Sequence, residues 1–397
     1  MKKLIFFCLL ILTCLDAFAA RITVSDYFQG IGGIRGGNTQ ALAYSPVEAA
    51  YYSGGAVATK EETFWVIRKG SERGGWKTVF SVPLSKTPFL WAGFKGFAFD
   101  RFGRIFAISR AMDRQRTVHW IVHRSSDRGA SWQVVDDFTP FSPGGLNYPY
   151  HIAAGPFGEI CIAGKGADTS EDGKEKVFAS IVRCSWTGGA SWFNSDWVLG
   201  AWGSGISFDR HGEILTSGYE IGETSRLLTR LSRDHGKTWK TVDTLSFPGQ
   251  QGGAISSFID AQGTYYALGS GWIDPTGTRR WFIRRSGDKG RTWQTVDQFS
   301  LEANKNAEAY EMTQRPSGEL LCVGYALDSL GRHHMILRRS RDQGRSWHTV
   351  VDHLGVEGRG FYGHNLSSGR RSVMVSGASY LENGRAWLTV KYEDTDR

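Results

Sequence analysis

The 397-residue chain lacks the features that mark several protein classes. After residue 20, no amphipathic helical periodicity stands out, and no apolar run is long enough to cross a bilayer as a helix. The five cysteines are too few for a disulfide framework, so a hydrophobic core must carry the fold. The net charge is +8, yet there is no dense Lys/Arg run and no nucleic-acid motif. We therefore expect neither a membrane-spanning nor a nucleic-acid-binding protein.

The N-terminal residues have the pattern of an export signal. Lys2 and Lys3 precede an apolar run at 4–15, and Ala17-Phe18-Ala19 fits a small-x-small cleavage site. We expect residues 1–19 to be a cleaved signal peptide and residues 20–397 to be a secreted or periplasmic protein. The mature chain would keep a net charge of +7. Such a basic surface suits acidic glycans or anionic envelope polymers, and it serves ordinary solubility equally well.

One motif, Ser-x-Asp-x-Gly-x-Ser/Thr-Trp, recurs along the chain. Full copies lie at 125–132, 232–239, 286–293 and 340–347. A copy at 185–192 has Thr187 in the Asp position, and a shorter one at 70–76 has Glu72 there. The spacing of the copies suits one four-stranded sheet per repeat.

The motif has the composition of a turn. Ser and Asp side chains bond backbone N–H groups that a turn leaves unpaired, and Gly adopts backbone angles that other residues resist. A motif copied into every repeat indicates a structural role, because an active site is not repeated. We assign this role to Asp127, Asp234, Asp288, Asp342, Trp132, Trp192, Trp239, Trp293 and Trp347.

Each repeat contains four strand-like runs joined by short turns, which favours antiparallel hairpins. In one repeat they lie at 254–260, 264–269, 280–286 and 293–299. Seven first strands can be counted, but the C-terminal repeat lacks a fourth strand. Arg21–Phe28 resembles a fourth strand standing alone. We predict one all-β domain, a seven-bladed β-propeller of four-stranded antiparallel blades, whose last blade is closed by the N-terminal strand.

Three cysteines lie in the predicted mature chain. Cys161 and Cys184 fall on the second and third strands of one repeat, and counting inward from the two turns places them opposite each other. Directly opposed residues on neighbouring antiparallel strands have Cα atoms close enough for a disulfide. A register error of one residue would instead put the side chains on opposite faces, so both states stay open. Cys322 is expected to be a buried free thiol.

The motif resembles the Asp box, or BNR repeat, of sialidase-like propellers, and the resemblance covers nearly the whole mature chain. Such propellers include sialidases, xyloglucan-degrading enzymes, sortilin-type receptors and a photosystem assembly factor, so the resemblance implies the fold far more than the chemistry. Sialidases carry a Phe/Tyr-Arg-Ile-Pro motif, an arginine triad and usually six blades. The nearest text here, Trp65-Val66-Ile67-Arg68, departs from that motif, and no triad is evident.

In the family, the motif turns lie on the face away from the ligand. The loops predicted on the other face vary most and are rich in aromatic residues, which stack on sugars or plug the channel. Candidate ligand-binding residues there are Trp91, Tyr148, Tyr150, Trp202, Trp272, Tyr310, Arg359 and Tyr362. Candidate catalytic residues are Glu308, Tyr310 and Glu311, because glycoside hydrolysis needs two nearby carboxylates.

We therefore expect an exported propeller that binds a glycan or envelope partner through its loop face without catalysis. The alternatives are a glycoside hydrolase using loop-face carboxylates and a protein–protein scaffold. A close acid pair in the central depression would favour the enzyme, whereas aromatics around an acid-poor depression would favour the glycan binder. We expect a monomer with no cofactor and no metal, since His333-His334 fits an exposed loop pair.

Overall fold

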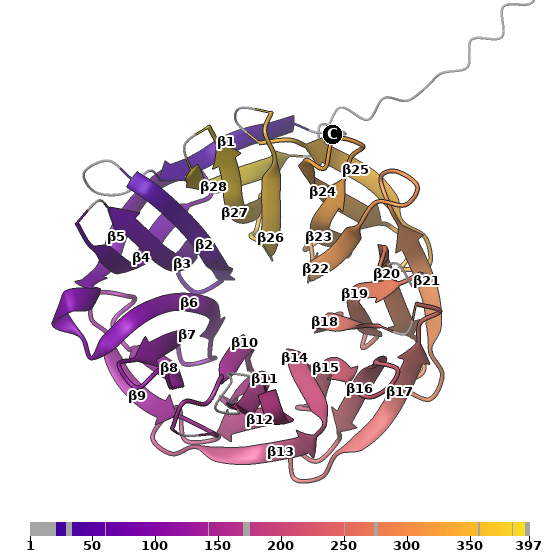
Figure 1. Ribbon diagram of the computed structural model, residues 1–397, viewed down its shortest axis with the longest axis horizontal. Helices are drawn as coiled ribbons and strands as arrows, with labels where there is room; N and C mark the ends of the chain where they lie inside the picture. Colours follow the sequence, from indigo (N-terminus) through magenta and orange to yellow (C-terminus); the bar gives the residue numbers. More distant parts are fainter. Residues whose placement is uncertain are drawn as a thin grey trace, which may run out of the picture.

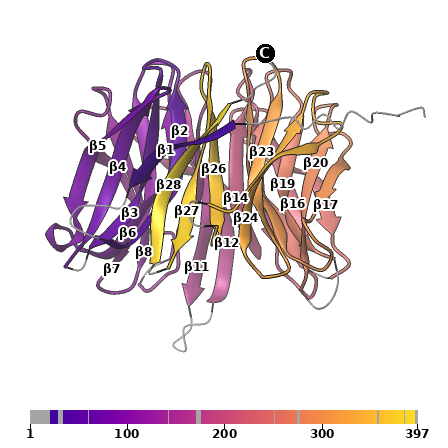
Figure 2. The same ribbon diagram turned by 90° about the horizontal axis from the view of Figure 1, so that it is seen from above.

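The computed structural model describes residues 21–28, 34–59, 61–141, 143–169, 175–249, 251–273, 277–355, 358–382 and 384–393. They form seven four-stranded antiparallel sheets set radially around a central axis (Figure 1). Figure 2 shows the same blades side-on, with connections gathered at their two ends. The predicted all-β, seven-bladed fold is confirmed. Within the described part of the chain, no helix is long and apolar enough to cross a membrane.

Blades are numbered along the chain, and their strands run from the axis outward. Blade 1 comprises β2(Ile34–Ser45), β3(Ala50–Thr59), β4(Thr63–Ser71) and β5(Gly74–Pro83). Blade 2 comprises β6(Phe89–Phe99), β7(Ile105–Asp113), β8(Val118–Ser125) and β9(Gln133–Phe138). Blade 3 comprises β10(Tyr148–Ala154), β11(Ile160–Thr169), β12(Glu175–Ser185) and β13(Phe193–Leu199). Blades 4 and 5 are β14(Ala201–Phe208) β15(Ile214–Glu220) β16(Arg226–Ser232) β17(Lys240–Ser246) and β18(Gly252–Ile259) β19(Tyr265–Trp272) β20(Arg279–Ser286) β21(Gln294–Phe299). Blades 6 and 7 are β22(Ala307–Gln314) β23(Leu320–Leu327) β24(His333–Ser340) β25(His348–His353) and β26(Phe361–Ser368) β27(Val373–Leu381) β28(Gly384–Glu393) β1(Arg21–Phe28). One short 3₁₀ turn, η1(Leu84–Lys86), links blades 1 and 2.

The N-terminal strand closes the ring, as predicted. Strand β1 pairs antiparallel with β28, with Arg21 opposite Glu393 and Phe28 opposite Trp387. Asp26 of β1 then joins blade 7 to blade 1 through a buried ion pair with Arg68, 2.7 Å between Oδ2 and Nε. Closure thus removes the open sheet edges that an unclosed array would leave.

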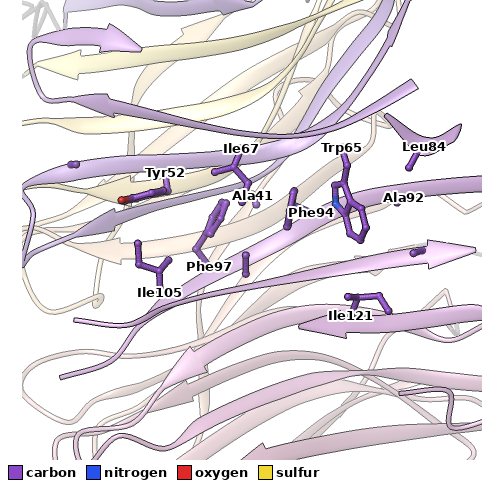
Figure 3. Close-up of a cluster of buried hydrophobic side chains, with 13 residues drawn as sticks. Ala41, Tyr52, Trp65, Ile67, Leu84, Ala92, Phe94, Phe97, Ile105 and Ile121 are labelled. Atoms are coloured by element: carbon purple, nitrogen blue, oxygen red, sulfur yellow. The ribbon is translucent and has the colours of Figure 1, made fainter. Parts of the chain in front are cut away.

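Blades pack on one another through apolar side chains. Between blades 1 and 2, Tyr52 and Trp65 of blade 1 pack against Phe94, Phe97 and Ile105 of blade 2 (Figure 3). In β7, β8 and β19, runs of consecutive residues are buried, so both faces of these second and third strands contribute to the core. The motif tryptophans pack at the edges of such clusters, immediately before the outer strands begin.

The motif forms a hydrogen-bonded turn in the structure. In blade 6, Ser340 Oγ accepts the Gly344 N–H at 2.8 Å and donates to Asp342 Oδ1 at 2.7 Å. Asp342 Oδ1 also accepts the Ser346 N–H at 2.9 Å, and Oδ2 accepts the Ser346 hydroxyl. Gly344 has a positive φ of 75°, a conformation that favours glycine. The copies at Asp127, Asp234 and Asp288 repeat this network.

The remaining copies differ in informative ways. Thr187 accepts the Ser191 N–H at 2.8 Å through its single hydroxyl, so the turn survives without a carboxylate. Glu72 instead reaches blade 7, where its Oε1 accepts the Arg371 N–H at 2.9 Å.

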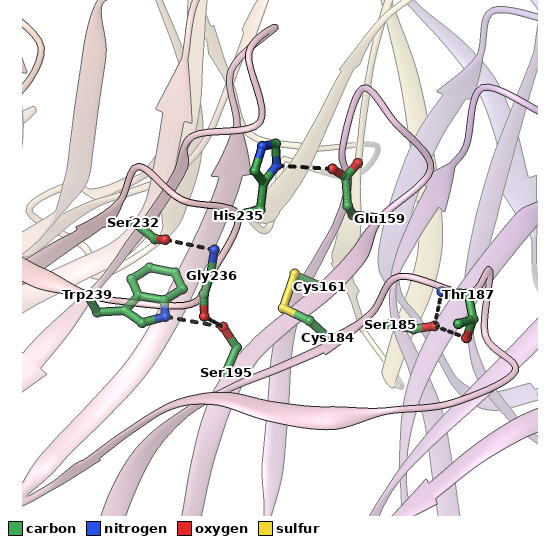
Figure 4. The surroundings of a disulfide bond; sticks show 10 residues. All are labelled: Glu159, Cys161, Cys184, Ser185, Thr187, Ser195, Ser232, His235, Gly236 and Trp239. Atoms are coloured by element: carbon green, nitrogen blue, oxygen red, sulfur yellow. Dashed lines mark hydrogen bonds and ion pairs between the residues drawn. A yellow bond between two sulfur atoms is a disulfide. The ribbon is translucent and has the colours of Figure 1, made fainter.

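Cys161 and Cys184 lie directly opposite each other on β11 and β12 and form a disulfide (Figure 4). Of the two states that the sequence leaves open, the bridge is therefore the one the structure contains. Cys322 is buried and free, as predicted.

Candidate binding cavity on the propeller axis

The innermost strand of every blade carries a β-bulge near its middle. The bulge sets two residues of the inner strand against one on its neighbour, so one side chain per blade is turned toward the axis. The seven bulged residues are Gln40, Lys95, Tyr150, Ser204, Ile255, Tyr310 and His364. We call these seven residues the bulge ring.

All seven residues of the bulge ring line one cavity of about 640 Å³ on the axis. That volume lies in the usual range of small-ligand sites. The other lining residues are His151, Trp202, Tyr219, Tyr362, Asn365, Ala378, Tyr380 and Arg385. The described lining thus holds six aromatic rings of Tyr or Trp and no Asp or Glu.

Two cavity-lining polar atoms have no hydrogen-bond partner among the described residues. They are Gln40 Oε1 and Trp202 Nε1, an acceptor and a donor. Both atoms are buried, and the Nε1 atoms of other tryptophans, such as Trp65 and Trp120, also lack a partner among the described residues. Lys165 Nζ lies 3.4 Å from the Trp202 ring centroid, which holds that ring by a cation–π contact.

The cavity is basic. Burial, reinforced by the nearby Arg110 charge, lowers the pKa of Lys95 to about 7. Burial, together with the charge of Lys95, lowers the pKa of His151 to about 4, so this histidine is neutral at pH 7. Arg385 is exposed, with its guanidinium carbon 4.8 Å from the Tyr380 ring centroid. The charged lining residues therefore favour anionic groups on a ligand.

Of the three candidate catalytic residues, Tyr310 lies in the bulge ring and Glu308 lies behind it. The Tyr310 hydroxyl donates to Glu308 Oε2 at 2.7 Å and also contacts the Tyr362 hydroxyl. The other Glu308 oxygen pairs with Arg279 from blade 5. Burial and the charge of Glu308 raise the pKa of Tyr310 well above its usual value. At neutral pH this phenol is therefore a hydroxyl donor.

Glu311 has a different environment from Glu308. Its Oε2 accepts the Leu366 N–H of blade 7 at 2.7 Å, which joins two blades. Burial raises the pKa of Glu311 to about 8, although the Leu366 N–H acts in the opposite sense. Glu308 and Glu311 thus have separate partners, and neither lines the cavity. Within the described residues, no group of three or more His, Cys, Asp or Glu is arranged to hold a metal ion.

A family model described as a BNR repeat-like domain matches residues 197–354. Together with the turn networks and the seven blades, this match decides the class of protein. The chain is a seven-bladed β-propeller with Asp-box turns, and its residues 197–354 match the BNR repeat-like family. No curated protein sequence matches it significantly.

Solved structures resemble this Asp-box propeller at low sequence identity. A protein of unknown function from Dyadobacter fermentans is 12% identical with a TM-score of 0.53, covering 94% of this chain and 98% of its own. A Penicillium chrysogenum α-L-arabinanase, solved with arabinobiose, is 15% identical with a TM-score of 0.50, covering 76% and 93%. A Fusarium graminearum α-L-arabinofuranosidase is 14% identical with a TM-score of 0.51, covering 78% and 94%. At these identities the likeness describes the fold alone.

The propeller places four of the eight candidate ligand-binding residues in the cavity: Tyr150, Trp202, Tyr310 and Tyr362. The other four lie outside its lining. Trp91 and Tyr148 pack on Arg110, with ring centroids 4.4 and 5.1 Å from the guanidinium carbon. Trp272 ends β19, and the exposed Arg359 is 4.0 Å from Glu382.

Several cavity residues were missed by reasoning from sequence, among them Lys95, His151, Tyr219, His364 and Arg385. A usable signal existed in the spacing, because the bulged positions recur every 51 to 55 residues. Their side chains differ from blade to blade, so a search for repeated residues does not find them.

Proposed function

We propose that the propeller binds a glycan in the axial cavity and does not cleave it. The observation that carries this proposal is the lining itself, which combines aromatic rings with polar and basic groups and has no described carboxylate. Aromatic rings stack on sugar faces, and the polar groups fix orientation. The basic groups favour a glycan with acidic units.

The test is a glycan-array screen of the purified protein, followed by calorimetric titration of the best oligosaccharide. Trp202→Ala should weaken binding by about tenfold, since one buried aromatic contact contributes on the order of 1 kcal/mol. The matched control is Phe157→Ala, which removes an aromatic ring exposed on the turn face. Equal losses in both variants, or no glycan bound at all, would contradict the proposal.

A second candidate function rests on the Tyr310–Glu308 hydrogen bond. A tyrosine beside a carboxylate is the nucleophile arrangement of some glycosidases. The protonated phenol and the Arg279–Glu308 ion pair argue against activation in this state. Product analysis decides between the two. Wild-type protein that releases new reducing ends, with the release abolished in Tyr310→Phe, would establish hydrolysis.

We also infer that the protein is exported and monomeric. The Cys161–Cys184 disulfide supports an oxidising compartment. Mass spectrometry of the natively produced protein should find an N-terminus at Ala20 and one free thiol, and light scattering should give the mass of one chain. An uncleaved N-terminus or three free thiols would overturn the export model.

A further inference from the structure

The closure of the ring creates a second cleft, whose lining residues differ in chemistry from those of the axial cavity. In blades 1 to 6 a tight turn joins the third strand to the outer strand. In blade 7 the corresponding strands are β28 and β1, which belong to opposite ends of the chain and end side by side at Glu393 and Arg21. The face that carries the Asp-box turns is therefore interrupted at one blade.

A cleft of about 780 Å³ lies at this interruption. Its charged lining comes from blades 6, 7 and 1: Arg21, Glu72, Arg73, Arg315, Arg370, Arg371, Lys391 and Glu393. Six of these side chains are cationic and two are acidic. The axial cavity, by contrast, combines its few cations with a ring of aromatics.

Both acidic residues of the cleft already have partners. Glu72 accepts the Arg371 N–H at 2.9 Å, and Glu393 pairs with Lys391 at 2.6 Å. Among the described residues, no ion pair joins Arg21, Arg73, Arg370 or Arg371 to a carboxylate. Arg370 is held at 3.2 Å from the Pro46 carbonyl oxygen. The cleft thus keeps four exposed guanidinium groups around one hollow.

We propose that this cleft binds a polyanion that carries sulfate or phosphate groups. Guanidinium groups donate in a planar fork that matches such oxyanions, and their charge persists at every physiological pH. Four of them converge here without a carboxylate partner among the described residues, so they repel one another until a multivalent anion neutralises them. The size of the hollow admits more than one anionic group, which favours a polymer over a single ion.

The test uses a heparin dodecasaccharide and a linear polyphosphate of similar charge, titrated into the protein at low and at moderate salt. The variant is Arg73→Gln/Arg370→Gln/Arg371→Gln. All three positions are exposed, so the fold should persist. The control is Arg114→Gln/Arg210→Gln/Arg291→Gln, which removes the same charge from exposed positions of blades 2, 4 and 5.

We expect tight, salt-sensitive binding that the cleft variant weakens by about tenfold or more and the control variant weakens by less than about twofold. A triple Arg→Lys variant at the cleft keeps the charge and loses the planar guanidinium groups, so its affinity should lie between those of the cleft variant and the control variant. The tighter of the two probes identifies sulfate or phosphate as the source. Equal losses in cleft and control variants, tighter binding of polygalacturonate, or no binding of either probe would overturn the proposal.

Discussion

Two sets of positions recur along the propeller, the Asp-box turns in blades 1 to 6 and the bulge ring in all seven blades, and they differ in what is repeated. In the Asp-box turns the side chains repeat, because each must place an oxygen against the same backbone N–H groups. In the bulge ring only the backbone repeats, and the seven side chains comprise six residue types. In the turns, the side chain must accept backbone hydrogen bonds, so few residue types can serve. In the bulge ring, the backbone alone turns the side chain toward the axis, so the residue type is free to vary.

The largest expected effect lies on the turn side of this comparison. Asp342→Ala removes the acceptor for both the N–H and the hydroxyl of Ser346, so we expect about 1–3 kcal/mol of lost unfolding free energy. Asp342→Asn keeps one acceptor and should lose less. Urea unfolding measures both. Glycan affinity should stay unchanged, and a stable variant that loses binding would place function at the turn.

The same turn should respond to acid. Burial acts to raise the pKa of Asp342, but hydrogen bonds from Ser346 and Ser340 outweigh it and lower the pKa to about 2. An unfolded Asp has a pKa near 3.8, so the unfolded chain binds the proton first as the pH falls. The contribution of this Asp is therefore complete above that value and is lost as pH falls toward 2.

The next effect lies on the bulge side. Tyr150→Ala should weaken glycan binding by about tenfold, the loss of one stacking contact. The bulge is a backbone feature, so the urea midpoint should stay within experimental error. Phe157→Ala, on the turn face of the same blade, is the matched control. A large stability loss in Tyr150→Ala would mean that the ring side chains hold the bulges in place.

A smaller effect concerns pH. With a pKa of about 7, Lys95 loses its charge as pH rises from 6 to 8. Affinity for an acidic oligosaccharide should therefore fall several-fold over that interval, as one cation is neutralised. Lys95→Arg stays charged, so its affinity should be high and independent of pH over this interval. Lys95→Met has no charge to lose, so its affinity should be low and independent of pH. An unchanged slope in both variants would exclude Lys95 as the titrating group.

This contrast also explains what the sequence could and could not predict. The closing strand was predictable because residues 21–28 resemble the other outer strands. The two turns set Cys161 and Cys184 opposite each other, but a one-residue register error could not be excluded from the sequence, so the disulfide stayed one of two open states. A bulge leaves no residue signature, so only the regular spacing of the bulged positions could have indicated that Lys95 and His364 face the axis. The Glu308–Arg279 pair joins two blades, and no local pattern predicts such a contact.

The smallest expected effect is a gain of stability at an Asp-box turn, where Asp342→Ala should cause a loss. Thr187 occupies the Asp position in blade 3, and its single hydroxyl accepts the Ser191 N–H and also contacts the Ser191 hydroxyl. Thr187→Asp would supply two oxygens in the geometry of the other copies, with the Arg124 guanidinium bonded to the adjacent Gly188 carbonyl as a favourable charge. We expect about 0.5–1 kcal/mol of added stability, seen as a higher urea midpoint. Thr187→Asn, which supplies one acceptor and no charge, should gain less. If Thr187→Asp instead lowers the midpoint, the turn at blade 3 has adapted to the hydroxyl, and the motif is less uniform than its repeated networks indicate.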